Sequence, residues 1–255
     1  MIPSSAQHIF ISDLHLSADT PHLNLGFLVL LKELTALPHL HALYILGDWF
    51  DGWIGDDDYL SLSHDDRQRH WLTPIIDSLI ILSKKTKIYI MHGNRDFAIG
   101  QAFCTTFGGQ LIKEPYLLHH HNTTYRLEHG DALCTDDKKY QRYRKIIRHR
   151  WVMWLLLKQP LTKRRQLAQN IKRQSYHDKA QKSSAIMDVN AQAVSIALSD
   201  CDVLIHGHTH RPDVHVLGDK VRFVLGDWQD DGQIFAIIGI LGDDGLTAHR
   251  FCVDL

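Results

Sequence analysis

Five short polar blocks carrying aspartate, asparagine and histidine recur along the chain, and four of them directly follow an apolar run with strand character. The runs are Ile9–Ile11, Leu43–Leu46, Ile88–Met91 and Val203–Ile205, with Tyr125–Leu127 as a weaker fifth. Side chains at the carboxyl ends of neighbouring strands meet at one edge of a sheet, where α/β proteins build their sites. The sequence therefore predicts one site formed by Asp13-Leu14-His15, Gly47-Asp48, Gly93-Asn94-Arg95-Asp96, His129-Gly130-Asp131 and His206-Gly207-His208-Thr209-His210.

Strand-like runs alternate with helical patterns in the first half of the chain. Helices are predicted at Leu23–Leu37 and near Asp65–Ser83, between the first three strands. This alternation is typical of an α/β fold, a sheet with helical crossovers. The last third is mostly β, with strands predicted at Val221–Leu225, Ile234–Ile240 and Leu246–Val253.

The segment 137–190 differs in character from the rest of the chain. It has no strand signal, and Pro160 divides it into two helical pieces. Residues 138–190 hold fifteen Lys and Arg against two Asp, a net charge of +13, whereas the remaining residues carry −14. We therefore predict a core formed by 1–136 and 191–255 and an inserted helical cap at 137–190.

Within the cap, Tyr140–Lys158 is predicted to form one basic amphipathic helix, with Ile147, Trp151, Trp154 and Leu155 at helical spacing. Two readings stay open. The apolar stripe could pack on the core, as in most amphipathic helices. Alternatively, it could line an acyl-chain chamber while the basic residues meet anionic lipid headgroups.

Composition excludes several other classes of protein. The four cysteines are scattered without paired spacing, so neither a zinc knuckle nor a disulfide framework is indicated. Residues 1–7 do not have the pattern of a signal peptide. The run Trp151–Leu157 is far shorter than the roughly 20 residues that a spanning helix needs.

The residue types in the five blocks indicate a metal site. In an extended segment residues i and i+2 point the same way, so Asp13 with His15, and His206 with His208, form two chelating pairs. Asp48, Asn94 and His129 each lie beside a glycine, which allows a close approach of the backbone. This mixture of oxygen and imidazole donors suits Mn(II), Fe or Zn better than calcium. Seven protein ligands exceed what one tetrahedral ion uses, so we expect two metals, bridged by Asp48.

The ordered set of blocks resembles the calcineurin-like metallophosphoesterases over nearly the full chain. That resemblance implies a four-layer α/β/β/α sandwich. Within this superfamily the sequence is similar to the UDP-2,3-diacylglucosamine diphosphatases (pyrophosphohydrolases) of bacterial lipid A synthesis. The more specific similarity lies in 44–48, 53–58, 92–97, 133–137 and 185–190.

The resemblance also implies roles for individual residues. Asp13, His15, Asp48 and His208 would hold one manganese ion, and Asp48, Asn94, His129 and His206 the other. His210 belongs to the motif but is not a ligand in that family. Arg95 would contact the substrate phosphate, which makes Asp48, Arg95 and His206 the expected catalytic residues. The expected substrate-binding residues are Asn94, Arg95, Asp137, Ser175, Lys182 and His206, together with Lys179, where relatives carry a small polar residue.

The implied reaction is attack of metal-activated hydroxide on the α-phosphorus of UDP-2,3-diacylglucosamine, giving UMP and 2,3-diacylglucosamine 1-phosphate (lipid X). The enzyme would act as a peripheral protein at the cytoplasmic face of the inner membrane, with no obligate protein partner and no nucleic acid. Two rival hypotheses remain. The first is a calcineurin-like nuclease or nucleotide phosphodiesterase, against which stand the apolar run Trp151–Leu157 and the acidic core. The second is a non-catalytic scaffold, which predicts eroded ligands, whereas all seven are present.

Overall fold

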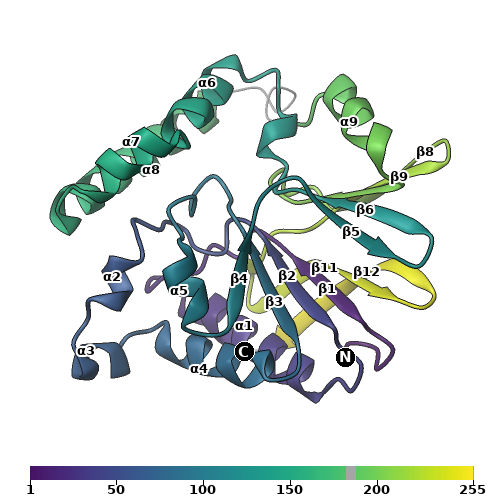
Figure 1. The fold of residues 1–255 in the computed structure, drawn as a ribbon, viewed down its shortest axis with the longest axis horizontal. Helices are drawn as coiled ribbons and strands as arrows, with labels where there is room; N and C mark the ends of the chain where they lie inside the picture. Colours follow the sequence, from purple (N-terminus) through teal and green to yellow (C-terminus); the bar gives the residue numbers. More distant parts are fainter. Residues whose placement is uncertain (182–187, 255) are drawn as a thin grey trace.

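The computed structural model describes residues 1–181 and 188–254, and within these ranges two sheets stack face to face (Figure 1). The first sheet has the order β10-β11-β1-β2-β3-β4, and β12 pairs with β11. Strands β1 to β4 are parallel, and β11 joins β1 antiparallel. Its strands are β1 (His8–Ile11), β2 (Ala42–Leu46), β3 (Lys87–Met91), β4 (Gly109–Ile112), β10 (Gln229–Asp230), β11 (Gln233–Gly242) and β12 (Gly245–Asp254).

The second sheet has the order β5-β6-β7-β9-β8. Its central strands β6, β7 and β9 are parallel, while β5 and β8 add antiparallel edges. Its strands are β5 (Tyr116–His120), β6 (Thr123–Leu127), β7 (Val203–His206), β8 (Asp213–Leu217) and β9 (Lys220–Val224).

Successive side chains of a strand point to opposite faces of the sheet, so each sheet packs against a separate apolar layer on each face. Ile9 and Ile11 of β1 face α1 (Pro21–Ala36), α4 (Thr73–Ser83) and α5 (Gln101–Thr105), whereas Phe10 faces the second sheet. Leu204 of β7 packs under α9 (Ala191–Ala197) and the short 3₁₀ helix η2 (Leu198–Asp200). Helices thus cover the outer face of each sheet, and the predicted four-layer α/β/β/α sandwich is confirmed.

The helices differ from the sequence prediction in two places. The helix predicted near Asp65–Ser83 is two helices, α3 (His64–Gln68) and α4, the second with Pro74 in its first turn. The single helix predicted at Tyr140–Lys158 is also two, α6 (Lys138–Ile147) and α7 (Arg150–Leu157). His149 ends the first because its backbone is extended, and its ring then accepts a hydrogen bond from the Trp151 N–H. The amphipathic pattern continues across the break between α6 and α7, so the sequence does not reveal that break.

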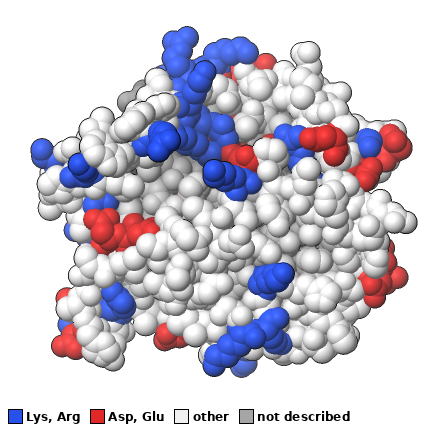
Figure 2. Space-filling model, viewed as in Figure 1, with Lys and Arg blue, Asp and Glu red and all other residues white. Residues whose placement is uncertain are grey.

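The basic helices α6, α7 and α8 (Leu161–Gln181) lie together at one end of the sandwich (Figure 1). Figure 2 shows Lys and Arg gathered in that region of the surface. Arg164 of α8 is almost fully buried and forks onto Asp57 of α2 (Asp57–Leu60), and it also donates to the Ile54 carbonyl at 2.6 Å. Arg165 pairs with Asp58 at 2.6 Å. The basic segment is thereby attached to the acidic start of α2. The 3₁₀ helix η1 (Asp131–Leu133) lies just before the basic segment in the chain.

Candidate metal centre

The five polar blocks lie at the carboxyl ends of β1, β2, β3, β6 and β7, as the sequence predicts. Backbone hydrogen bonds tie the loops together: Asp13 N–H donates to Gly47, and His15 N–H donates to Asp48. The buried Asp96 carboxylate accepts from the N–H groups of Gly93 at 2.7 Å and Trp49 at 2.8 Å. Asp96 thus fixes the loop after β2 against the loop after β3.

Asp48 lies at the middle of the cluster. Ligand atoms of Asp13, Asp48 and His129 lie within 4.8 Å of one another, and all three residues are buried. His129 Nε2 is 3.7 Å from Asp48 Oδ1 and 3.0 Å from Asn94 Oδ1. Its other ring nitrogen lies 2.9 Å from the Leu46 carbonyl oxygen, which fixes the ring orientation.

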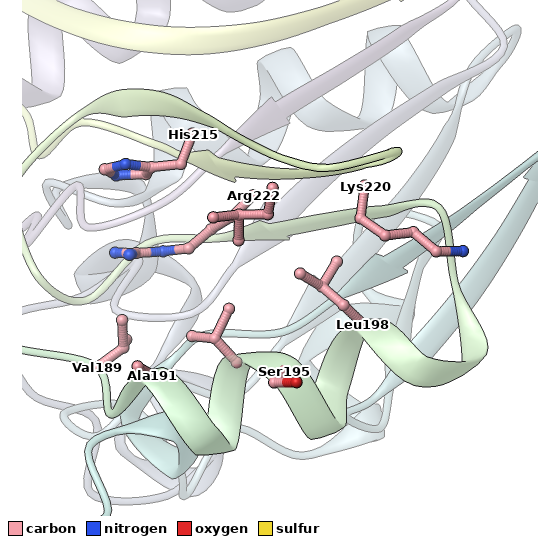
Figure 3. A pocket seen from close by; sticks show the side chains of 9 residues that line it. Val189, Ala191, Ser195, Leu198, His215, Lys220 and Arg222 are labelled. Atoms are coloured by element: carbon pink, nitrogen blue, oxygen red, sulfur yellow. The ribbon is translucent and has the colours of Figure 1, made fainter.

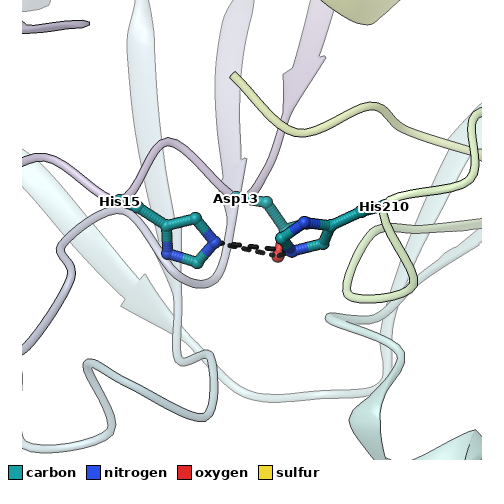
Figure 4. Close-up of side chains that lie close together, drawn as sticks. All are labelled: Asp13, His15 and His210. Atoms are coloured by element: carbon teal, nitrogen blue, oxygen red, sulfur yellow. Dashed lines mark hydrogen bonds and ion pairs between the residues drawn. The ribbon is translucent and has the colours of Figure 1, made fainter. Parts of the chain in front are cut away.

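A second group combines Asp13, His15 and His210 (Figure 4). Asp13 Oδ1 lies 4.0 Å from His15 Nε2 and 3.4 Å from His210 Nε2. His15 Nδ1 is 3.9 Å from Asp48 Oδ2, so His15 connects the two groups. His210 is held from behind by Asp227, at 3.1 Å from its Nδ1.

His206 and His208, the last two predicted ligands along the chain, lie beside these two groups. His208 donates its backbone N–H to Asp13 Oδ2 at 2.8 Å, and its ring lies 5.0 Å from the ring of His129. His206 is fully buried at the end of β7, and the next residue, Gly207, donates its backbone N–H to the His129 carbonyl oxygen at 2.9 Å. The structure thus brings all seven predicted ligand residues together.

The backbone at this cluster is strained. Non-glycine residues with positive φ are Asp13, His15, Asp48, His208 and His210, and His121 elsewhere among the described residues. Such conformations cost about 1–3 kcal/mol each and persist where the surroundings impose them. Glycine makes the packing possible, because a Cβ on Gly93 would lie 2.1 Å from Asp48 Oδ1. The strain therefore concentrates at the predicted site.

Burial keeps three of the imidazoles neutral. It lowers the pKa of His15 to about 3, of His206 to about 4 and of His208 to about 3. Burial also raises the pKa of Asp48 to about 7. For His129 burial acts downward, but the carboxylates of Asp48 and Asp13 outweigh it and raise the pKa to about 9. Neutral imidazole is the form that binds metals, so metal binding would release the proton of His129.

The residues present fit divalent cations. Asp13 Oδ1 and His15 Nδ1 are buried without a hydrogen-bond partner, although both lie inside the cluster. Buried polar atoms normally have partners, and here a cation would supply the missing one. The donor set of carboxylate, carboxamide and imidazole suits a transition metal or zinc.

Arg95 lies at the edge of the cluster. Its backbone N–H donates to Asp48 Oδ1 at 2.8 Å, and its Nε is 3.7 Å from Asp48 Oδ2. The guanidinium is hydrogen-bonded to Asp51, which also binds Lys172 of α8. Asp51 therefore links Arg95 to α8 of the basic segment.

A partly buried ionic network joins α6 to the same cluster. Arg144 Nε and Arg148 Nη2 donate to Asp131 Oδ2 at 2.9 and 3.0 Å, and both arginines pair with Glu114. Glu114 in turn accepts from the His129 N–H at 3.2 Å. Although burial acts in the opposite direction, Arg148 and its neighbours hold the pKa of Asp131 well below its usual range.

The remaining predicted residues lie on the basic segment. Asp137 is the N-cap of α6 and accepts from the Tyr140 N–H at 3.0 Å. Ser175 and Lys179 fall on α8, where their side chains are outside those described, and Lys182 lies outside the described residues. The structure therefore leaves these substrate contacts as predictions.

Several residues around the cluster escaped the sequence analysis: Asp51, Glu114, Arg144, Arg148, Arg222 and Asp227. Each lies far along the chain from the group that it contacts. The four-residue spacing of Arg144 and Arg148 places both on one helix face and is the one local signal that was available.

Comparison with known proteins agrees with the geometry. The model of the calcineurin-like phosphoesterase family matches residues 8–212. A UDP-2,3-diacylglucosamine hydrolase of Shewanella piezotolerans is 41% identical over 232 residues, covering 90% of this chain and 93% of its own. One of Coxiella burnetii is 39% identical over 253 residues, covering 97% and 98%. A solved archaeal phosphodiesterase aligns over 96% of this chain and 99% of its own, with 14% identity and a TM-score of 0.46.

Proposed function

Because the chain belongs to the calcineurin-like phosphoesterases, and among them to the UDP-2,3-diacylglucosamine hydrolase family, we propose that it cleaves the pyrophosphate bond of UDP-2,3-diacylglucosamine. The products would be UMP and 2,3-diacylglucosamine 1-phosphate, an intermediate of lipid A synthesis. The chain is an enzyme, a hydrolase. The proposal is supported by one observation, the convergence of the predicted ligands at the carboxyl ends of the strands, where Asp13, Asp48, His129 and His206 are buried and His15, Asn94 and His208 are partly buried.

Two Mn(II) ions would be held by the residues of that cluster. Asp13, His15, Asp48 and His208 would hold one, and Asp48, Asn94, His129 and His206 the other. When bound, the ions supply a nucleophilic hydroxide near neutral pH and neutralise charge on the phosphate. His210 lies within reach of Asp13 and His15 and would act from outside the ligand set.

The protein's own groups orient the substrate. Arg95 would place its guanidinium against the oxygens of the α-phosphoryl group, where its planar fork matches their geometry. Asp51 holds that guanidinium at the edge of the cluster in advance. Asp137, Ser175, Lys179 and Lys182 would contact the sugar-phosphate part from the basic segment.

The exposed face of α7 supports a role at a membrane surface. No residue of this helix is buried, and Trp151 and Leu155 are 62% and 55% exposed. Lys158 Nζ lies 3.8 Å above the Trp154 ring. The described residues include no helix long and apolar enough to span a bilayer. An exposed Trp and Leu surface with adjacent cations suits a lipid interface.

We therefore propose a metallophosphoesterase core at 1–136 and 191–255 and a helical cap at 137–190 that contacts the lipid substrate and the anionic cytoplasmic face of the inner membrane. Vesicle sedimentation at low ionic strength tests this. The double variant Trp151→Ser, Trp154→Ser should lose binding to anionic vesicles, whereas Leu25→Ser, on the exposed side of α1, should keep it. Equal binding by both variants would contradict the interfacial role.

The reaction itself is tested with purified protein, Mn(II) and three substrates: UDP-2,3-diacylglucosamine, the unacylated UDP-sugar and single-stranded DNA. We expect cleavage of the lipid substrate alone, and in ¹⁸O-labelled water the label should enter UMP. Label in the lipid phosphate would place the attack on the other phosphorus. Cleavage of DNA would favour a nuclease.

A further inference from the structure

A cavity lies between α9 and the β8–β9 hairpin (Figure 3). Its volume is about 460 Å³, within the size range of small-molecule sites. Two cross-strand pairs, His215 with Arg222 and Leu217 with Lys220, form the side contributed by the hairpin. Ala191, Val194, Ser195 and Leu198 form the opposite side, contributed by α9 and η2.

Arg222 connects this cavity to the metal centre. Its Nε lies 3.0 Å from Nε2 of His206, one of the seven predicted ligands. The side chain is 15% exposed, and its Nη2 lies 3.8 Å from Asp188 Oδ1, beyond hydrogen-bond distance. Arg222 therefore lies between the metal centre and the cavity, where it could contact a phosphate bound at the metals.

The lining has the chemistry of a nucleoside site. Apolar side chains from both sides provide surfaces for a flat base, while Ser195 and His215 offer hydrogen-bonding groups for a base edge or ribose hydroxyls. An acyl chain would not favour this cavity, because it would cover Arg222 and the polar groups of Ser195 and His215 with hydrocarbon.

The position of the cavity also separates the two arms of the substrate. In Figure 1 helices α6, α7 and α8 lie on one side of the site and α9 with β8 and β9 on the other. Asp137, Ser175 and Lys182, the residues of the basic segment that the sequence predicts to contact the UDP-glucosamine part, belong to the first side by their place in the chain. A substrate cleaved between its two phosphates extends in both directions from the metals, so the nucleoside arm needs a place on the second side.

We propose that this cavity is the subsite for the nucleoside of the nucleotide arm, with Arg222 beside the phosphate that the arm carries. The inference rests on the proposed function for its choice of ligand. Ser195 is exposed on α9 and lines the cavity, so Ser195→Trp fills it without disturbing the core. Gln192→Trp, exposed on the same helix but outside the lining, is the matched control.

The test is calorimetric titration of the Mn-loaded protein with UMP, ribose 5-phosphate and inorganic phosphate. The wild type and Gln192→Trp should bind UMP at least tenfold more tightly than ribose 5-phosphate. Ser195→Trp should lose that preference and keep its affinity for inorganic phosphate. Its hydrolysis of bis(p-nitrophenyl) phosphate, which has no nucleoside, should stay unchanged, while KM for UDP-2,3-diacylglucosamine should rise about tenfold.

Two outcomes separate this inference from the proposed function. If UDP-2,3-diacylglucosamine is cleaved but neither UMP affinity nor KM responds to Ser195→Trp, the subsite is wrong and the function stands. If the lipid substrate is not cleaved but UMP binds with the predicted dependence on Ser195, the function is wrong and the nucleotide site stands.

Discussion

Arg148, at the end of α6, donates a hydrogen bond of 2.8 Å to the carbonyl oxygen of Gly93, the residue that precedes Asn94. The same guanidinium binds Asp131 and Glu114. The basic segment is therefore part of the support of the metal centre, in addition to its proposed contact with lipid.

Replacing Arg148 should weaken metal binding more than it weakens substrate binding. Arg148→Met removes the support of the Gly93–Asn94 peptide, and loss of such outer contacts typically lowers metal affinity 10- to 100-fold. Titration of the metal-free protein with Mn(II), followed by electron paramagnetic resonance, measures this directly. Arg142→Met, exposed on the same helix, is the control and should bind as the wild type does. Unchanged Mn(II) affinity in a folded Arg148→Met protein would show that the contact has no supporting role.

A methyl group on Gly93 should disable the site while the rest of the fold persists. The added Cβ would lie 2.1 Å from Asp48 Oδ1 and 2.2 Å from its backbone nitrogen, so the two loops must separate. A displacement of about 1 Å at reacting groups can cost about 100-fold in rate. We expect Gly93→Ala to lower kcat/KM by at least about that factor. Gly52→Ala is a matched control because nothing lies within 4 Å of its added Cβ, and an equally active Gly93→Ala would refute the close-packing argument.

Removal of metal should lower the thermal stability. The buried Asp13 Oδ1 and His15 Nδ1 have no hydrogen-bond partner in the protein, so bound cations would stabilise the folded state. A ligand at 100 times its Kd contributes about 2.7 kcal/mol, or a shift of several degrees in a protein of this size. Differential scanning calorimetry with EDTA and after reloading with Mn(II) checks this. In Asp48→Ala the added Mn(II) should produce a much smaller shift, and a full shift there would exclude Asp48 as a bridging ligand.

The sequence could predict that the central residues of the candidate site lie together, because each block is a short local motif that follows a strand. Asp13 with His15 and His206 with His208 are two residues apart and follow or end a strand, but the extended backbone assumed for each pair is wrong, because Asp13, His15 and His208 have positive φ. The supporting residues depend on tertiary structure: Asp227 meets His210, and Arg222 meets His206, through strand pairing that no short pattern encodes. The edge strands β4 and β8 were not predicted either, although Asp213–Leu217 of β8 does alternate polar and apolar residues.

Arg164 should hold the basic segment on the core. Its guanidinium is buried and bonded to Asp57 and to the Ile54 carbonyl, so Arg164→Met leaves these acceptors without their donor. Loss of a hydrogen-bonded charge costs about 1–3 kcal/mol. We expect lower stability in urea and a raised KM for the lipid substrate, with unchanged hydrolysis of bis(p-nitrophenyl) phosphate. Arg165→Met, which loses an exposed pair, should change stability by less than about 1 kcal/mol. Equal effects of the two variants would argue against an anchoring role for Arg164.

His8 should make the protein sensitive to acid at a place remote from the metals. Burial, and then the neighbouring rings of His120 and His41, lower the pKa of His8 to about 4 from 6.5. The unfolded chain therefore binds the proton more readily, so the stabilisation is complete above pH 6.5 and is lost as the pH falls toward 4. The loss should amount to about 1–3 kcal/mol. His8→Phe keeps an aromatic ring but cannot be protonated, so unfolding in urea with EDTA present should show the wild type losing stability relative to this variant between pH 6.5 and 4. His39→Gln, at an exposed position, should follow the wild type. Parallel curves of unfolding free energy against pH for all three proteins would show that His8 does not make stability depend on pH.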